Sequence, residues 1–201
     1  MKFAAVRLGS LMVVLTLLAA AGIQDETEWE FYAMSAWGQS GQARLNNWYL
    51  LNALEPVSDE PEAGARHFLD RNSLASNAYE GTGGTLRVWQ KTLLIGITKP
   101  YEEARAEIEK EEEKRLGRKL SVLDMAVVFP LAVNRAAKEI RTLFEINCES
   151  GEFIVLEMNI YDVEGSRMIR ETNSNQDLWY PVQPGSVMDL LARKACGRAP
   201  N

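Results

Sequence analysis

The sequence predicts an α+β domain, in which an antiparallel sheet of about six strands carries a C-terminal helix tied to it by one disulfide. In the last third of the chain, apolar and polar residues alternate with the period of a half-buried strand. An amphipathic run follows Ser186, as expected for a helix that packs on a sheet. Cys148 and Cys196, the only two cysteines, end a strand-like run and this helix-like run, so one bridge would join helix and sheet.

The chain opens with the features of a secretory signal peptide. Lys2 and Arg7 precede an apolar stretch at 11–18, which small residues follow. Because that stretch is shorter than the roughly 20 residues that span a bilayer, a cleaved signal is favoured over a retained membrane anchor. We expect cleavage before Gly22, which makes residues 1–21 the signal peptide. No cysteine stands at the cleavage point, so no lipid anchor is expected.

The mature chain is long enough for one domain with a hydrophobic core and too short for two large ones. We expect an N-terminal strand with a variable insertion over 22–65, and a sheet domain over 66–201 that carries a charged helical insertion at 99–139. Loss of Lys2 and Arg7 with the signal takes the net charge from −6 to −8. That balance argues against nucleic acid or an anionic membrane as the primary partner.

Strand patterns occur at six places, in the order 29–34, 66–70, 85–92, 144–148, 154–161 and 166–170. Short turns join the last three, which predicts an antiparallel meander. Simple alternation places these side chains of the fifth strand on one face: Ile154, Leu156, Met158 and Ile160. It places these on the other: Val155, Glu157, Asn159 and Tyr161.

Two helical patterns lie between the third and fourth strands. The stretch 101–116 is rich in Glu, Lys and Arg, and only three of its apolar side chains could face a core, so we expect most of its surface to be solvated. From 120 to 131 the chain becomes apolar, and Pro130 is expected to interrupt any helix there. A further short helix is expected over 44–54, where apolar residues recur at three-residue spacing.

The C-terminal helix is expected to begin at Ser186, where Pro184 and Gly185 end the extended chain. Asp189, its third residue, complements the exposed amides of the first turn. The apolar stripe that continues to Cys196 consists of Met188, Leu191, Ala192 and Ala195. The helix should therefore pack through its cysteine face. A Cys148–Cys196 bridge would close a loop of 48 residues and stabilise the fold by roughly 4 kcal/mol.

Five segments carry a resemblance to a known family, namely 68–74, 86–92, 143–148, 179–186 and 190–196. In this order they are similar to the surface-adhesin protein E family of Gram-negative bacteria. The resemblance implies a sheet that curves around a C-terminal helix held by the Cys148–Cys196 disulfide. It also implies an adhesin-like role, in which a member of the family binds host matrix and serum proteins. The stretches 36–65 and 99–139 are additions to that pattern.

The sequence offers little to support catalysis. His67 is the only histidine, it lies in an expected strand, and no Gly-x-Ser-x-Gly elbow presents a serine to it, so an ordinary sheet residue is the favoured interpretation. The consecutive acids at 111–113 point in different directions on a helix and cannot converge on one ion. No enzyme activity, metal or cofactor is therefore expected.

Two groups of residues are candidates for binding. The only dense basic cluster could bind a sulfated glycan or an acidic partner, although complementing the end of a helix is a simpler role; it consists of Lys114, Arg115, Arg118 and Lys119. The second group could form a binding surface or belong to the core and the sheet edge; it consists of Trp29, Trp89, Trp179 and Tyr180.

These observations lead to an exported, non-enzymatic binding protein that resembles surface-adhesin protein E and recognises a protein or matrix partner. The alternative is a structural or envelope-assembly protein that uses the same fold in the periplasm without adhesion. Both place the protein in the periplasm or at the cell surface. An uncovered edge strand could also pair with its copy in a homodimer.

Overall fold

The computed structural model describes residues 28–36, 54–59, 61, 64–77, 84–174 and 178–197, with the side chains of 75–77 excepted. The expected signal peptide, and the helix expected over 44–54 except for its last residue, lie outside these residues. Leu54 itself is not helical. None of the described helices is long and apolar enough to cross a membrane.

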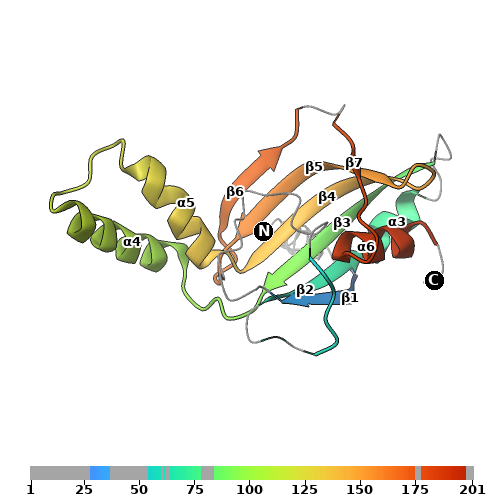
Figure 1. Cartoon of the computed structure of the whole chain (residues 1–201), viewed down its shortest axis with the longest axis horizontal. Coiled ribbons are helices and arrows are strands. Elements are labelled where there is room, and N and C mark those ends of the chain that lie inside the picture. Colours follow the sequence, from blue (N-terminus) through green and yellow to red (C-terminus); the bar gives the residue numbers. More distant parts are fainter. Residues whose placement is uncertain are drawn as a thin grey trace, which may run out of the picture.

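The predicted α+β fold with an antiparallel sheet is confirmed, and the sheet has seven strands, where the sequence predicts about six (Figure 1). Six strands lie side by side in chain order: β1 (Trp29–Ala36), β2 (Gly64–Asp70), β3 (Thr85–Leu94), β4 (Glu139–Asn147), β5 (Glu152–Tyr161) and β6 (Arg167–Thr172). The short β7 (Tyr180–Pro181) pairs with the start of β5. Four helices accompany the sheet: α3 (Arg71–Asn77), α4 (Tyr101–Leu116), α5 (Met125–Ala136) and α6 (Val187–Ala195). The α4–α5 hairpin lies in the connection between β3 and β4 and extends away from the sheet (Figure 1).

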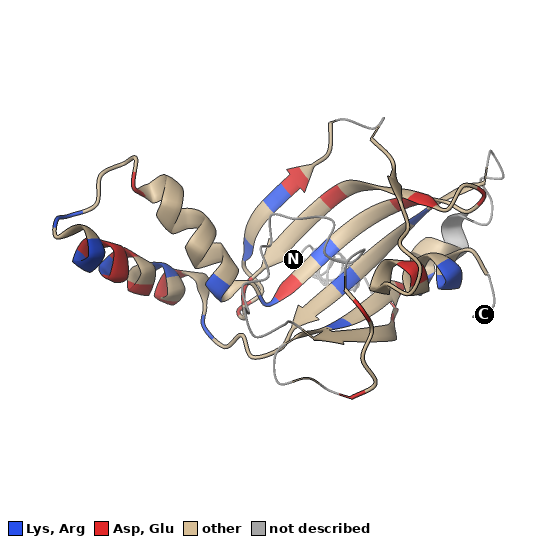
Figure 2. Ribbon diagram, viewed as in Figure 1, with Lys and Arg blue, Asp and Glu red and all other residues tan. Residues whose placement is uncertain are grey.

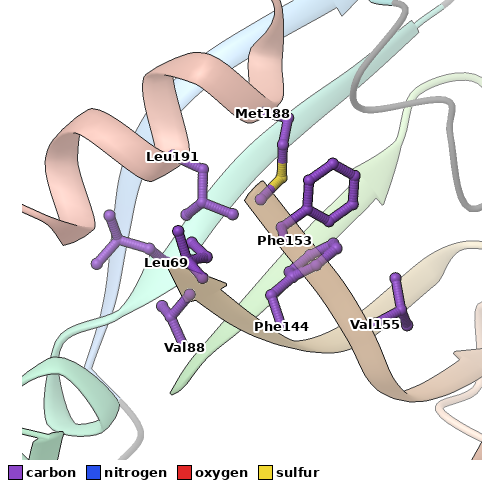
Figure 3. Close-up of a cluster of buried hydrophobic side chains, with 8 residues drawn as sticks. Leu69, Val88, Phe144, Phe153, Val155, Met188 and Leu191 are labelled. Atoms are coloured by element: carbon purple, nitrogen blue, oxygen red, sulfur yellow. The ribbon is translucent and has the colours of Figure 1, made fainter. Parts of the chain in front are cut away.

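Helix α6 covers one face of the sheet, which we call the inner face. Ser186 caps the helix as predicted, because its Oγ accepts a hydrogen bond from the amide of Asp189 at 3.1 Å. Met188 and Leu191 point from α6 toward Phe144 and Phe153 of the strands (Figure 3). The complete cluster of buried side chains is Leu69, Val88, Phe144, Ile146, Phe153, Val155, Met188 and Leu191.

The predicted disulfide between Cys148 and Cys196 is confirmed. Its S–S distance is 2.04 Å, and the two Cα atoms lie 5.7 Å apart. Cys148 directly follows β4 and Cys196 directly follows α6. The bridge therefore fixes α6 onto the inner face at the end of the helix that the cap does not hold.

A second buried cluster joins the base of the α4–α5 hairpin to the other end of the inner face. Its buried members are Ala65, Leu94, Val133, Ala137, Met158 and Ile160. Tyr101, at the start of α4, packs against them, and its amide donates to Asp162 Oδ2 at 3.2 Å. The inner face thus carries one core under α6 and another under the hairpin base.

The face assignment expected for β5 is wrong. The register with β4 shifts between Leu143, which pairs with Glu157, and Phe144, which pairs with Val155, so Leu156 is an extra residue. Such a bulge resets the alternation of side chains. Val155 and Met158 therefore lie on the same inner face, in the first and second cluster respectively.

The expectation that Pro130 interrupts the second helix is also wrong. Pro130 is the sixth residue of α5, which runs on to Ala136. The proline ring removes only the hydrogen bond to the carbonyl of Ala126, and Ala126 is exposed in the first turn, where water can satisfy that carbonyl. The helix is held by its packing against α4, where its buried side chains are Val128, Ala132, Val133 and Ala136.

Candidate binding surface

The face of the sheet opposite α6, which we call the outer face, carries a row of side chains that crosses six strands. The strand registers align it pair by pair, as Phe31, Phe68, Lys91, Arg141, Asn159 and Arg170. Each member alternates along its strand with residues of the inner face. The row is therefore aromatic on β1 and β2, and polar and cationic on β4 to β6.

Aromatic rings hold the two central cations of this row. The ammonium group of Lys91 lies 4.5 Å from the ring centroid of Trp29 and 5.1 Å from that of Phe68. The guanidinium carbon of Arg141 lies 4.9 Å from the ring centroid of Tyr161. Partial burial lowers the pKa of Lys91, because removal from water disfavours the charged ammonium. These cation–π contacts fix long side chains that would otherwise be mobile in solvent.

A groove of about 450 Å³ lies beside the row. Its lining comes from six strands, β1 to β6, and consists of Trp29, Asp70, Trp89, Arg141, Glu157, Asn159, Tyr161, Arg167 and Arg170. Bulky rings and guanidinium groups together form a surface of the type that supplies most of the binding energy at protein interfaces.

Glu157 organises the polar end of the groove. Its carboxylate accepts hydrogen bonds from Asn159 Nδ2 at 2.9 Å and from Arg170 Nη2 at 3.2 Å. These bonds lower the pKa of Glu157, the one from Asn159 most, so the carboxylate stays ionised at neutral pH. Asn159 is almost fully buried, and its Oδ1 accepts no hydrogen bond from any residue that the structure describes. Because this atom is also closed off from solvent, its missing hydrogen bond is a cost to the fold.

The inner face carries a different polar group around His67, between the two hydrophobic clusters. Gln90 Nε2 lies 3.2 Å from His67 Nδ1, and His67 Nε2 lies 2.8 Å from Ser35 Oγ. Thr92 Oγ1 lies 3.1 Å from the same Nδ1, so both ring nitrogens have hydrogen-bond partners within the sheet. Burial lowers the pKa of His67 to about 3.

The Ser35–His67 pair does not have the properties of a nucleophile and its base. A carboxylate orients the base in such a pair, whereas Thr92 and Gln90 lie beside Nδ1 of His67, at 3.1 and 3.2 Å. Both members of the pair are fully buried. The group is part of the packed interior, as the interpretation of His67 as an ordinary sheet residue expects.

The basic cluster predicted from the sequence lies far from the groove, at the end of α4 and in the loop that follows it. Arg115 pairs with Glu112 at 2.6 Å, and Arg118 binds both oxygens of Asp124 at 2.8 and 3.1 Å. Lys114 and Lys119 form no ion pair within the part of the chain that the structure describes.

The predicted aromatic candidates separate into two groups. Trp29 and Trp89 line the outer groove, whereas Tyr180 packs into the first core cluster, with its ring centroid 5.9 Å from that of Phe153. The sequence analysis did not predict that Arg141, Arg167 and Arg170 belong to this site. They lie near the tryptophans because of how the strands pair, and the pattern within one strand does not reveal its pairing.

These observations define a class of protein: a disulfide-tied α+β domain whose sheet carries a helix on its inner face and aromatic and charged side chains on its outer face. The family model described as Surface-adhesin protein E matches residues 54–197, which is most of the chain. The protein belongs to this family. No curated protein and no solved structure matches the chain.

Proposed function

We propose that the protein is an exported, non-enzymatic, adhesin-like binding protein that recognises a protein partner through the outer face of its sheet. The observation that carries this proposal is the groove, which combines two tryptophans with three arginines on the sheet face opposite α6. Tryptophan and arginine are the residues most enriched among those that dominate binding energy. Membership of the surface-adhesin family supports a binding role over catalysis.

The cations of the groove give it a further preference. Asn159 and Arg170 already bind Glu157, whereas Arg167 lies exposed at the rim. We therefore expect the partner to present an acidic or apolar segment that contacts the arginines and rings.

Binding of the oxidised mature protein to immobilised matrix proteins, serum proteins and envelope fractions tests the proposal. Arg167→Ala should weaken binding of any captured partner by about tenfold, since Arg167 is exposed at the rim of the groove. Lys110→Ala is the matched control, because it removes an equally exposed cation from α4 and should leave binding unchanged. Failure to bind any macromolecule, or equal binding by both variants, overturns the proposal.

Location separates the adhesin role from the periplasmic alternative. Protease treatment of intact cells should digest the protein and spare a periplasmic control if the outer face meets extracellular partners. Protection until the outer membrane is permeabilised would instead direct the search to envelope proteins of the same cell. In either compartment, weaker binding by Arg167→Ala then identifies the partners that contact the outer face.

A further inference from the structure

The α4–α5 hairpin ends in a loop whose function the outer-face site does not account for. β3 and β4 pair along their whole length, so a short turn would have sufficed to join them. Instead the chain runs out along α4 and returns along α5 (Figure 1). Arg135 of α5 pairs with Glu111 of α4 at 3.0 Å, and the hairpin base is packed into the second core cluster. The loop at 117–124 is thus held away from the sheet on a fixed support.

A single carboxylate organises this loop. Asp124 accepts hydrogen bonds from both the amide and the hydroxyl of Ser121 at 2.6 Å, and from the guanidinium of Arg118. Gly117, with φ of 65°, ends α4 in the left-handed conformation that favours glycine. The side chains between Ser121 and Asp124 are therefore presented by an ordered turn.

Those side chains are apolar and almost fully in solvent. Val122 is 89% exposed and Leu123 is 85% exposed, more than any other large apolar side chain that the structure describes. Val127, one turn further along α5, is 50% exposed. Helix α5 has no charged residue before Arg135, whereas both acidic and basic residues lie along α4 (Figure 2). An ordered turn that exposes Val and Leu together is a feature of surfaces that meet a partner or a membrane.

Cations surround this apolar tip. Between Lys114 and Val127 the chain has four basic residues and one carboxylate, Asp124, which Arg118 and Ser121 already bind. Lys119 is exposed, and the cations of the loop stand at the far end of the hairpin in Figure 2. Apolar side chains flanked by lysine and arginine are the pattern of segments that lie in a membrane interface.

The negative net charge of the chain does not oppose this pattern at the tip. The acids at the start of α4 are distant, because the helix has 16 residues and is about 24 Å long, whereas charges are screened over about 8 Å at physiological ionic strength. The acids next to the tip are Glu111, Glu112 and Glu113, of which Arg135 binds the first and Arg115 the second. Among the charges of the tip that no ion pair between described residues neutralises, Lys114 and Lys119 therefore outnumber Glu113.

We propose that the hairpin tip docks on an anionic phospholipid bilayer. Val122 and Leu123 enter the boundary between headgroups and acyl chains, and Lys114 and Lys119 lie against lipid phosphates. A second copy of the chain is a poorer occupant, because its tip would bring the same cations face to face. This site is independent of the groove on the outer face, so either can operate without the other.

Flotation of the oxidised mature protein with vesicles tests the proposal. The wild type should float with vesicles of phosphatidylethanolamine and phosphatidylglycerol, and less with vesicles of phosphatidylcholine alone. The double change Val122→Ser and Leu123→Ser should lower partitioning about ten- to hundredfold, because both side chains leave water on docking. Leu178→Ser is the matched control, since it removes an exposed leucine from the sheet domain and should change nothing.

The cation contribution is tested separately. Lys114→Gln and Lys119→Gln should each lower partitioning about fivefold on vesicles with phosphatidylglycerol and have no effect on phosphatidylcholine. Because Lys114, Lys119, Val122 and Leu123 are all exposed, the variants should fold, which an unchanged melting temperature verifies.

Three outcomes overturn the docking proposal. The first is that the wild type fails to float with anionic vesicles at low salt, and the second is that the serine double variant floats as well as the wild type. The third is that the lysine variants bind each of the two vesicle types as strongly as the wild type does. If the wild type sediments as a dimer and binds no vesicles, and the serine double variant sediments as a monomer, the tip binds a second copy of the chain instead.

Discussion

The inner and outer faces of the sheet are built from alternate residues of the same strands, yet they treat polar side chains in opposite ways. On the inner face, Gln90 and His67 bond to each other, and both are sealed between two apolar clusters. On the outer face, Lys91 and Arg141 lie against aromatic rings and remain in reach of a ligand. The comparison shows that burial, not residue type, decides whether a polar group is sealed in the core or remains accessible at the surface.

The largest effect should come from removing an inner-face ring. Phe144→Ala leaves a cavity beneath α6 and should lower the free energy of unfolding by about 3–5 kcal/mol. Leu143→Ala, one residue away on the outer face and only half-buried, should cost clearly less. Urea denaturation of both variants measures the difference, and equal losses would contradict the difference in packing between the inner and the outer face.

The disulfide should rank next. Cys196→Ser frees the end of α6 from β4 and should lower the free energy of unfolding by about 2–4 kcal/mol, since the bridge closes a loop of 48 residues. The check is the melting midpoint of the variant and of the wild type, both under oxidising conditions. An unchanged midpoint would show that the core under α6 holds the helix without the bridge.

Acid should lower the stability of the fold through the buried His67. The pKa of His67 is lowered to about 3 from 6.5, so the unfolded chain takes up a proton at a pH where the folded chain does not. The free energy of unfolding should therefore fall by about 1.4 kcal/mol for each pH unit below about 6.5, until the folded pKa is reached. His67→Gln should lose this component, and denaturation of both proteins across that range measures it. Parallel pH profiles would mean that His67 is accessible to protons in the folded state.

The smallest effect on stability should come from the outer face. Arg170→Ala removes an exposed ion pair with Glu157 and should change the free energy of unfolding by less than about 1 kcal/mol. The same variant should weaken partner binding, which separates recognition from folding. A loss comparable with that of Phe144→Ala would place Arg170 in the structural framework of the sheet.

The sequence predicted those elements that depend on local chemistry. Helix α4 has the predicted bounds, 101–116, because strong helix formers fill it and Gly117 ends it. The cap at Ser186 and the Cys148–Cys196 bridge were also predicted, since each follows from residue type and neighbours. Family membership agrees with the ordered segments found in the sequence.

The remaining features depend on contacts between distant segments. The bulge at Leu156 exists because β4 and β5 pair with one extra residue, and alternation along β5 alone does not reveal it. The groove likewise needs Trp29 of β1 beside Arg141 of β4, and these residues are far apart in the sequence. Alternation correctly placed Asn159 and Tyr161 together on one face, but it could not name their neighbours across the sheet.

The disulfide also determines how the molecule responds to a pulling force. Tension applied at two points outside the bridged loop passes through the covalent bond between Cys148 and Cys196 and bypasses the chain between them. The 48-residue separation corresponds to about 160 Å of extended chain that such a force cannot draw out. β5, β6 and α6 all lie within that loop, whereas β1 to β3 lie outside it. Under flow or traction, the first part of the sheet can therefore lengthen while the last part stays short.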